Sequence, residues 1–251
     1  RCIVISQPVT TPMLHWFVKF LNEKEEEEEE EEETALVLRY HQTFLAAYEA
    51  FMASKEGEND RFLKVHVDCA HGVGFPQLQA LLSLSPLSFL PFNGPEDEGG
   101  VLNENCGAEF VQKRRLPPKG VPKGVPKSGG AVFGCSFDGD ADRIVFYDLL
   151  EKEDEKEDEK DDDEDEIEDV SSFRLLDGDR ILVLMALFLQ RELRGLHAFL
   201  QEEEEEEEGF INGVVAIQTA YANGASTHFL QANDIEVAFA KTGVKHLHHE
   251  A

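Results

Sequence analysis

The stretch Ser136-Phe-Asp-Gly-Asp-Ala-Asp-Arg143 decides the fold, because it places three carboxylates at alternate positions between two apolar segments. The flanking residues 131–137 and 144–148 are rich in Val, Phe and Ile, which predicts two β-strands. Small residues separate the carboxylates, so a tight loop can bring all three to one point. The sequence therefore predicts a strand–loop–strand unit with an acidic tip.

A cation would relieve the repulsion among Asp138, Asp140 and Asp142. Three anions this close in a partly dry loop repel one another strongly. Oxygen donors without sulfur or imidazole suit Mg²⁺ or Ca²⁺ rather than zinc. We therefore expect these three aspartates to be metal ligands.

The pattern of the loop also has three other interpretations. An EF-hand is excluded, because its sixth position requires Gly and its twelfth Glu, whereas the sequence has Arg143 and Leu149. A phosphatase with Asp138 as nucleophile and Asp140 as acid/base lacks an obvious Lys and downstream acids. An ordinary solvated Asp-rich turn stays open on the hexapeptide alone.

The formal charge of −29 is concentrated in three low-complexity tracts, residues 23–33, 151–169 and 202–208. These tracts carry −28 of that charge, so the rest of the chain is nearly neutral. Such segments cannot bury enough apolar area to offset their ordering entropy, so we expect disordered insertions. The alternative role of these acidic tracts is to bind cations or histone-like partners. No basic patch is left to neutralise phosphates, which argues against a nucleic-acid partner.

Strands alternate with helices along the remaining sequence, which predicts an α/β chain, in two similar units. Thr34 is expected to cap the second helix. Gly72 and Gly74 form a turn, not a dinucleotide fingerprint, because the third Gly position is Gln77. Besides the two strands named above, the expected strands are 2–6, 62–67, 89–92 and 213–218, and the expected helices are 13–21, 34–53, 76–83 and 181–193.

The four cysteines show no CxxC pair and no zinc-like spacing. Cys69 and Cys135 lie in apolar, strand-like contexts and are expected to be buried and reduced, in a cytoplasmic protein. No apolar run is long enough to span a membrane, so no membrane partner is expected. The sequence begins with Arg1 rather than Met, which suggests a fragment or an incomplete gene sequence.

The acidic loop resembles the metal loop of the α-D-phosphohexomutases. Further stretches narrow the resemblance to the phosphoacetylglucosamine mutase family, and together they cover nearly everything outside the acidic tracts and the Lys-Gly-Val-Pro repeat of residues 117–127. They are Thr11-Pro-Met-Leu-His15, Val67-Asp-Cys-Ala-His-Gly72, Leu102-Asn-Glu-Asn-Cys-Gly-Ala-Glu-Phe110, Gln218-Thr-Ala-Tyr-Ala-Asn-Gly224 and Lys241-Thr-Gly-Val-Lys-His-Leu-His-His249.

The resemblance implies an isomerase that interconverts N-acetylglucosamine 6-phosphate and 1-phosphate on the route to UDP-N-acetylglucosamine. In this family a phosphoserine donates its phosphoryl group, and Mg²⁺ is held by the three loop aspartates and the phosphoserine oxygen. The implied fold is a set of phosphohexomutase-like α/β domains with mixed sheets, here incomplete. The implied divisions are the end of domain 1 (1–54), domain 2 (61–150), an acidic insertion (151–172) and the start of domain 3 (173–251).

The same resemblance suggests residues that act on the substrate. Arg143 is expected to grip the transferring phosphate, with a structural ion pair as its alternative role. Gly243, Val244 and Lys245 are expected to bind the substrate, with Lys245 and then His246 as candidates for proton transfer. The alternative for these histidines is an ordinary polar helix start.

The sequence also departs from the family. It contains no Ser-His-Asn-Pro motif for the phosphoserine, no later Glu-containing sugar loop and no phosphate-gripping fourth domain. Two alternatives therefore stay open: a catalytically inactive acidic cation-binding or interaction module on a mutase-like fold, and another phosphohexomutase acting on glucose or mannose phosphates.

Purified residues 1–251 are expected to show no mutase turnover, even with a sugar bisphosphate activator, because the sequence lacks the nucleophilic serine motif. A coupled assay for the 6-phosphate product checks this expectation. Turnover that scales with the concentration of the purified chain would contradict it.

Overall fold

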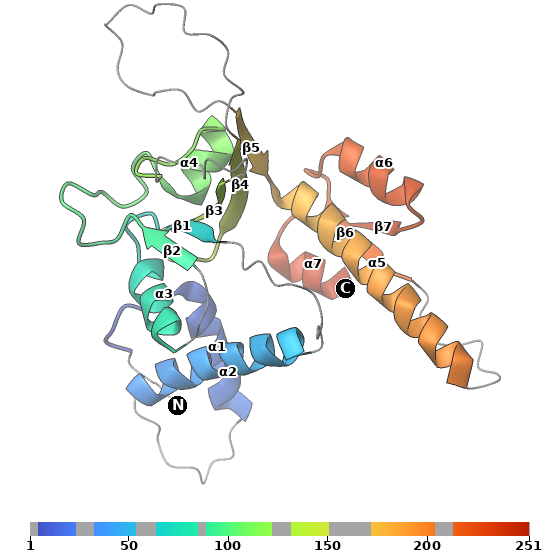
Figure 1. Ribbon diagram of the computed structural model, residues 1–251, viewed down its shortest axis with the longest axis horizontal. Coiled ribbons are helices and arrows are strands. Elements are labelled where there is room, and N and C mark those ends of the chain that lie inside the picture. Colours follow the sequence, from blue (N-terminus) through green and yellow to red (C-terminus); the bar gives the residue numbers. More distant parts are fainter. Residues whose placement is uncertain are drawn as a thin grey trace, which may run out of the picture. The chain divides into compact units, whose positions relative to one another are not determined.

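The computed structural model describes residues 5–23, 33–53, 64–84, 89–121, 132–150, 172–203 and 213–250. The chain divides into two compact units, Arg1–Leu175 and Leu176–Ala251 (Figure 1). Most of each acidic tract, residues 54–63 between the expected domains 1 and 2, and most of the expected strand at 2–6 lie outside the described residues.

Unit 1 begins with helices α1 (Thr11–Glu23) and α2 (Glu33–Ala53), which pack through Met13, Phe17 and Leu36. Both helices were predicted, but Thr34 is not the cap of α2. The helix already begins at Glu33, whose carboxylate accepts hydrogen bonds from the backbone of the residues that precede α1.

A five-stranded sheet forms the centre of unit 1, with the strand order β2-β1-β3-β4-β5. Strand β1 is parallel to β2 and β3, whereas β3 and β4 are antiparallel, so the expected α/β fold with a mixed sheet is confirmed. The strand β5 was not predicted, because it directly follows an acidic tract. The strands are β1 (Val65–Asp68), β2 (Phe89–Phe92), β3 (Val132–Phe137), β4 (Ile144–Leu150) and β5 (Ser172–Leu176).

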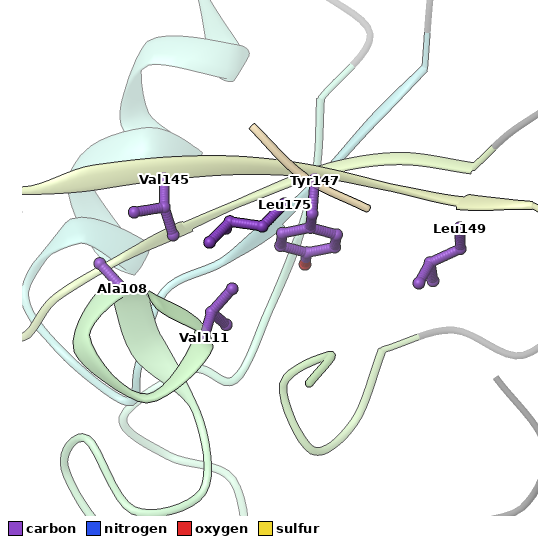
Figure 2. Packing of buried hydrophobic residues seen from close by; sticks show 6 residues of the cluster. All are labelled: Ala108, Val111, Val145, Tyr147, Leu149 and Leu175. Atoms are coloured by element: carbon purple, nitrogen blue, oxygen red, sulfur yellow. The ribbon is translucent and has the colours of Figure 1, made fainter. Parts of the chain in front are cut away.

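Two helices cover opposite faces of this sheet. Alternate side chains of β4 point to opposite sides, so each helix packs against a different set of them. On one side α4 (Gly107–Arg114) buries Ala108 and Val111 against Val145, Tyr147 and Leu149, as Figure 2 shows. On the other side Phe146 joins a cluster that includes residues of α3 (Gly74–Ser83). Helix α4 was not predicted, because its eight residues present too few apolar side chains for a clear helical period.

The carboxylate of Asp68, at the end of β1, is fully buried and joins four segments. Its Oδ1 accepts hydrogen bonds from the Ala70 backbone N–H at 3.0 Å and the Asn93 side chain at 2.8 Å. Its Oδ2 accepts from the Gly107 backbone N–H and the Ser136 hydroxyl, both at 2.7 Å. Because four donors satisfy this anion, it fixes the ends of β1, β2 and β3 and the start of α4 relative to one another.

Unit 2 contains a parallel pair of strands, β6 (Val215–Thr219) and β7 (Glu236–Ala240). Helix α5 (Gly178–Glu203) extends beyond its predicted range of 181–193, and α6 (Gly224–Ala232) and α7 (Val244–Glu250) complete the unit. The core of this unit is Ala186, Ala216, Leu230 and Ile235. Within the described residues, every helix is too short or too polar to cross a membrane.

Replacing Asp68 with Asn is expected to lower the free energy of unfolding of unit 1 by about 2–4 kcal/mol. An amide nitrogen cannot accept the two bonds that Oδ2 accepts, so two buried donors lose their acceptor. Urea denaturation followed through the fluorescence of Trp16, the single tryptophan, measures this loss.

Ser136→Ala is the matched control, because it removes one donor and leaves the carboxylate. It is expected to cost about 1 kcal/mol. If Asp68→Asn unfolds at the same urea concentration as the wild type, the four-bond account of Asp68 is wrong.

Candidate metal centre

The acidic loop joins β3 to β4 at the edge of the sheet where the parallel strands β1, β2 and β3 end. Carboxyl ends of parallel strands are the usual place for ligand sites in open α/β sheets. The structure brings Asp138, Asp140 and Asp142 together, with one carboxylate oxygen of each within 4.8 Å of the others. The Asp138 side chain is buried, whereas the other two are exposed.

The loop keeps its shape through contacts with its own backbone and with the turn after β1. Ala141 adopts a left-handed conformation with φ of +55°, and its N–H donates to the Asp138 carbonyl at 3.1 Å. The Val73 N–H donates to the Gly139 carbonyl at 3.0 Å. A Cβ at Gly72 would lie only 2.3 Å from that carbonyl oxygen, so this close approach requires glycine.

Arg143 compensates the buried charge of Asp138. Its Nε donates to Asp138 Oδ2 at 2.7 Å and its backbone N–H donates to Oδ1 at 3.1 Å. Burial by itself raises the pKa of the Asp138 carboxyl, but the hydrogen bonds and charge of Arg143 outweigh it, so this pKa lies below its ordinary value. Asp138 is therefore an anion at neutral pH.

The pKa of the Asp142 carboxyl is shifted in the opposite direction from that of Asp138. Desolvation, followed by its hydrogen bond and repulsion with Asp138, raises the pKa of the Asp142 carboxyl. One guanidinium thus faces three clustered carboxylates, and the loop retains negative charge. Donor sets of oxygen alone suit Mg²⁺, which uses a few carboxylates and completes its shell with water or phosphate oxygens.

Glu109, on α4, contacts the other end of the Arg143 guanidinium. Its Oε2 lies 3.4 Å from both Nη atoms, and it also pairs with Lys113. Hydrogen bonding and charge from Lys113, with Arg143 in support, lower the pKa of the Glu109 carboxyl. Arg143 is therefore held between Glu109 and Asp138, about half exposed.

The second group of predicted site residues lies in unit 2. Gly243 directly precedes α7 with φ of +119°, and Val244, Lys245 and His246 form the first turn of that helix. Lys245 is exposed and His246 is partly buried. Because β6 and β7 are parallel, these residues and the loop after β6 lie at the carboxyl edge of the same strand pair.

Sequence reasoning missed three residues around the loop. Asp68 and Glu109 were quoted only as parts of motifs, without a role. Thr11 was likewise quoted without a role, although its hydroxyl donates to Asp140 Oδ2 at 2.6 Å. A carboxylate directly after a buried strand is a signal that could have identified Asp68. Contacts across 34 or 129 residues leave no signal in a single sequence.

Solved structures define the class to which this fold and loop belong. The chain is similar to N-acetylglucosamine-phosphate mutase of the α-D-phosphohexomutase superfamily, in its substrate complex, with a TM-score of 0.67 and 31% identity over 97% of this chain and 39% of that one. It is also similar to Aspergillus fumigatus N-acetylphosphoglucosamine mutase in complex with GlcNAc-6P and magnesium, with a TM-score of 0.69 and 31% identity over the same shares. The class is therefore the α-D-phosphohexomutase superfamily.

Sequence comparisons identify the family within this class. Residues 33–145 match domain II, and residues 177–251 domain III, of phosphoacetylglucosamine mutase AMG1. The phosphoacetylglucosamine mutases of Arabidopsis thaliana and Saccharomyces cerevisiae are 38% and 36% identical over 97% of this chain. The chain belongs to the phosphoacetylglucosamine mutase family. It spans 38% and 39% of the length of these two relatives.

Replacing Arg143 with Gln in the metal-free protein is expected to lower the free energy of unfolding at pH 7 by about 1–2 kcal/mol. A carboxylate whose pKa is lowered by folding adds stability above its unfolded-state pKa of about 3.9, and that stability is lost as the pH falls through the folded-state pKa. The difference from the wild type should therefore shrink below about pH 4.

Urea unfolding at pH 7 and at about pH 3.5 measures this difference. Arg114→Gln, which changes an exposed arginine of α4, is the matched control and should show no such pH dependence. A deficit for Arg143→Gln that is equal at both pH values would contradict the assignment of Arg143 to Asp138.

Proposed function

We propose that this chain carries the magnesium-holding part of a phosphoacetylglucosamine mutase active site. The reaction is the interconversion of N-acetylglucosamine 6-phosphate and 1-phosphate by phosphoserine- and Mg²⁺-dependent phosphoryl transfer, in UDP-N-acetylglucosamine biosynthesis. The observation that carries the proposal is the convergence of Asp138, Asp140 and Asp142 at the carboxyl edge of the sheet, in a chain of this family.

In this proposal each side chain of the loop has a separate task. The three aspartates hold Mg²⁺, which when bound supplies positive charge to the transferring phosphoryl group. Arg143 supplies a second, fixed positive charge beside the metal, and its guanidinium can grip phosphate oxygens in pairs. The contact with Glu109 at 3.4 Å holds that guanidinium at the mouth of the loop.

The proposal assigns substrate contacts in unit 2 to the segment from Gly243 to His246. Lys245 is an exposed cation at the start of α7, which suits contact with a sugar phosphate. The Gly243 and Val244 backbone would shape this segment around the substrate, and His246 would take part in proton transfer. The names of the relatives favour N-acetylglucosamine phosphate over other hexose phosphates as the substrate.

The nucleophilic serine is assigned to a segment that this sequence does not contain, since no Ser-His-Asn-Pro motif occurs in it. We also assign the protein to the cytoplasm. Cys69, Cys106 and Cys135 are buried and unpaired, and burial raises the pKa of Cys135 to about 12. Thiols of this kind are inert and fit a reducing compartment.

Calorimetry on residues 1–251 tests both parts of the proposal. Asp140→Asn is expected to weaken Mg²⁺ binding at least about tenfold, because one anionic ligand is lost. The titration is run at about 0.15 M salt, which screens weak association of Mg²⁺ with the acidic tracts. Equal Mg²⁺ affinity for wild type and variant would overturn the metal assignment.

With Mg²⁺ present, Lys245→Ala is expected to weaken binding of N-acetylglucosamine 6-phosphate about tenfold, the cost of one charged hydrogen bond. Lys19→Ala is the matched control, because Lys19 is an exposed lysine of α1 that pairs only loosely with Glu23. If the two lysine variants bind the sugar phosphate equally well, Lys245 does not contact the substrate.

A further inference from the structure

Thr11, the first residue of α1, makes two hydrogen bonds to the middle aspartate of the metal loop. Its hydroxyl donates to Asp140 Oδ2 at 2.6 Å, and its backbone N–H donates to the Asp140 carbonyl at 3.0 Å. These two bonds join residues 129 positions apart in the sequence. They connect the start of a helix directly to a predicted metal ligand.

The Thr11 hydroxyl is not needed to cap α1, because the preceding residue does that. The Thr10 hydroxyl accepts the Met13 N–H at 3.4 Å, and the Thr10 carbonyl accepts the Leu14 N–H at 3.1 Å. Thr10 is buried, as expected for a residue in this structural role. The Thr11 side chain is therefore available for its contact with Asp140.

Two further contacts hold the segment before α1 in place. The Glu33 carboxylate accepts hydrogen bonds from the backbone N–H groups of Ser6 and Gln7, both at 2.8 Å. The Gln77 side chain, on α3, donates to the Pro8 carbonyl at 2.7 Å. Because this segment is fixed to α2 and α3, Thr11 approaches the loop from an anchored position.

Asp140 depends on such a contact more than Asp138 does. Asp138 is buried and held by both the backbone and the side chain of Arg143. Asp140 is exposed, and among the described residues its carboxylate accepts the hydroxyl of Thr11. An exposed carboxylate without such a bond rotates freely, which costs entropy when it binds a metal.

We propose that Thr11 is a positioning residue for the metal centre. Its hydroxyl fixes the orientation of the Asp140 carboxylate, so that the oxygens of Asp138, Asp140 and Asp142 face one point before Mg²⁺ binds. This inference rests on the proposed metal site and adds a residue to it. Thr11 precedes the region that matches domain II, so the α1 segment contributes to a site formed by that domain.

Thr11→Val removes the hydroxyl and keeps the shape of the side chain, so Mg²⁺ affinity should fall about tenfold. Thr11→Ser retains the hydroxyl and should bind Mg²⁺ about as tightly as the wild type, without the loss of at least about tenfold that removal of such a hydrogen bond causes. The matched control is Thr43→Val, which removes a hydroxyl bonded to the Arg39 carbonyl within α2, and it should leave Mg²⁺ affinity unchanged.

Calorimetric titration of each 251-residue variant with Mg²⁺ measures the affinity, and Trp16 fluorescence reports whether α1 keeps its packing. The expected result for Thr11→Val is weaker binding with unchanged Trp16 emission. Asp140→Asn, which removes a proposed ligand, tests the metal site independently of Thr11.

If Asp140→Asn loses affinity while Thr11→Val binds like the wild type, the role of Thr11 is overturned and the metal site stands. If neither variant changes the affinity, the metal site itself fails and Thr11 has nothing to position. If Thr11→Ser is as weak as Thr11→Val, the hydroxyl is not responsible and the inference is likewise overturned.

Discussion

The buried carboxylate of Asp68 is the interaction on which the candidate site depends. A fully buried anion is tolerated only when donors satisfy it, and here four donors do so from the ends of three strands and the start of α4. Ser136, one of these donors, lies two residues before the first aspartate of the acidic loop. The position of the loop therefore follows from how the sheet supplies hydrogen-bond donors to one buried carboxylate.

The three aspartates of the acidic loop, at the carboxyl edge of the sheet, are each stabilised in a different way. This arrangement suits a metal site. Arg143 neutralises Asp138, and a neutral hydroxyl from Thr11 orients Asp140. Asp142 is exposed and lies beside these two aspartates. One guanidinium cannot balance three carboxylates. A site that is held in shape but left with excess negative charge is prepared for a small divalent cation.

Strong local patterns were predictable from the sequence, and long-range contacts were not. The two strands around Asp138 and the apolar helix after Asp177 have clear patterns. The strands formed where expected, and the helix includes its predicted range of 181–193 but extends beyond it. Helix α4 is short and polar, and β5 directly follows an acidic tract, so tertiary contacts decide their formation. The loop aspartates could be identified from their spacing, but the contact with Thr11 exists only after folding brings distant segments together.

Anomalous diffraction from crystals of the chain grown with Mn²⁺ in place of Mg²⁺ tests the central claim most directly. The account predicts one strong anomalous peak within coordination distance, about 2.2 Å, of an oxygen from each of Asp138, Asp140 and Asp142. An anomalous peak elsewhere, with none at these three carboxylates, would contradict the account.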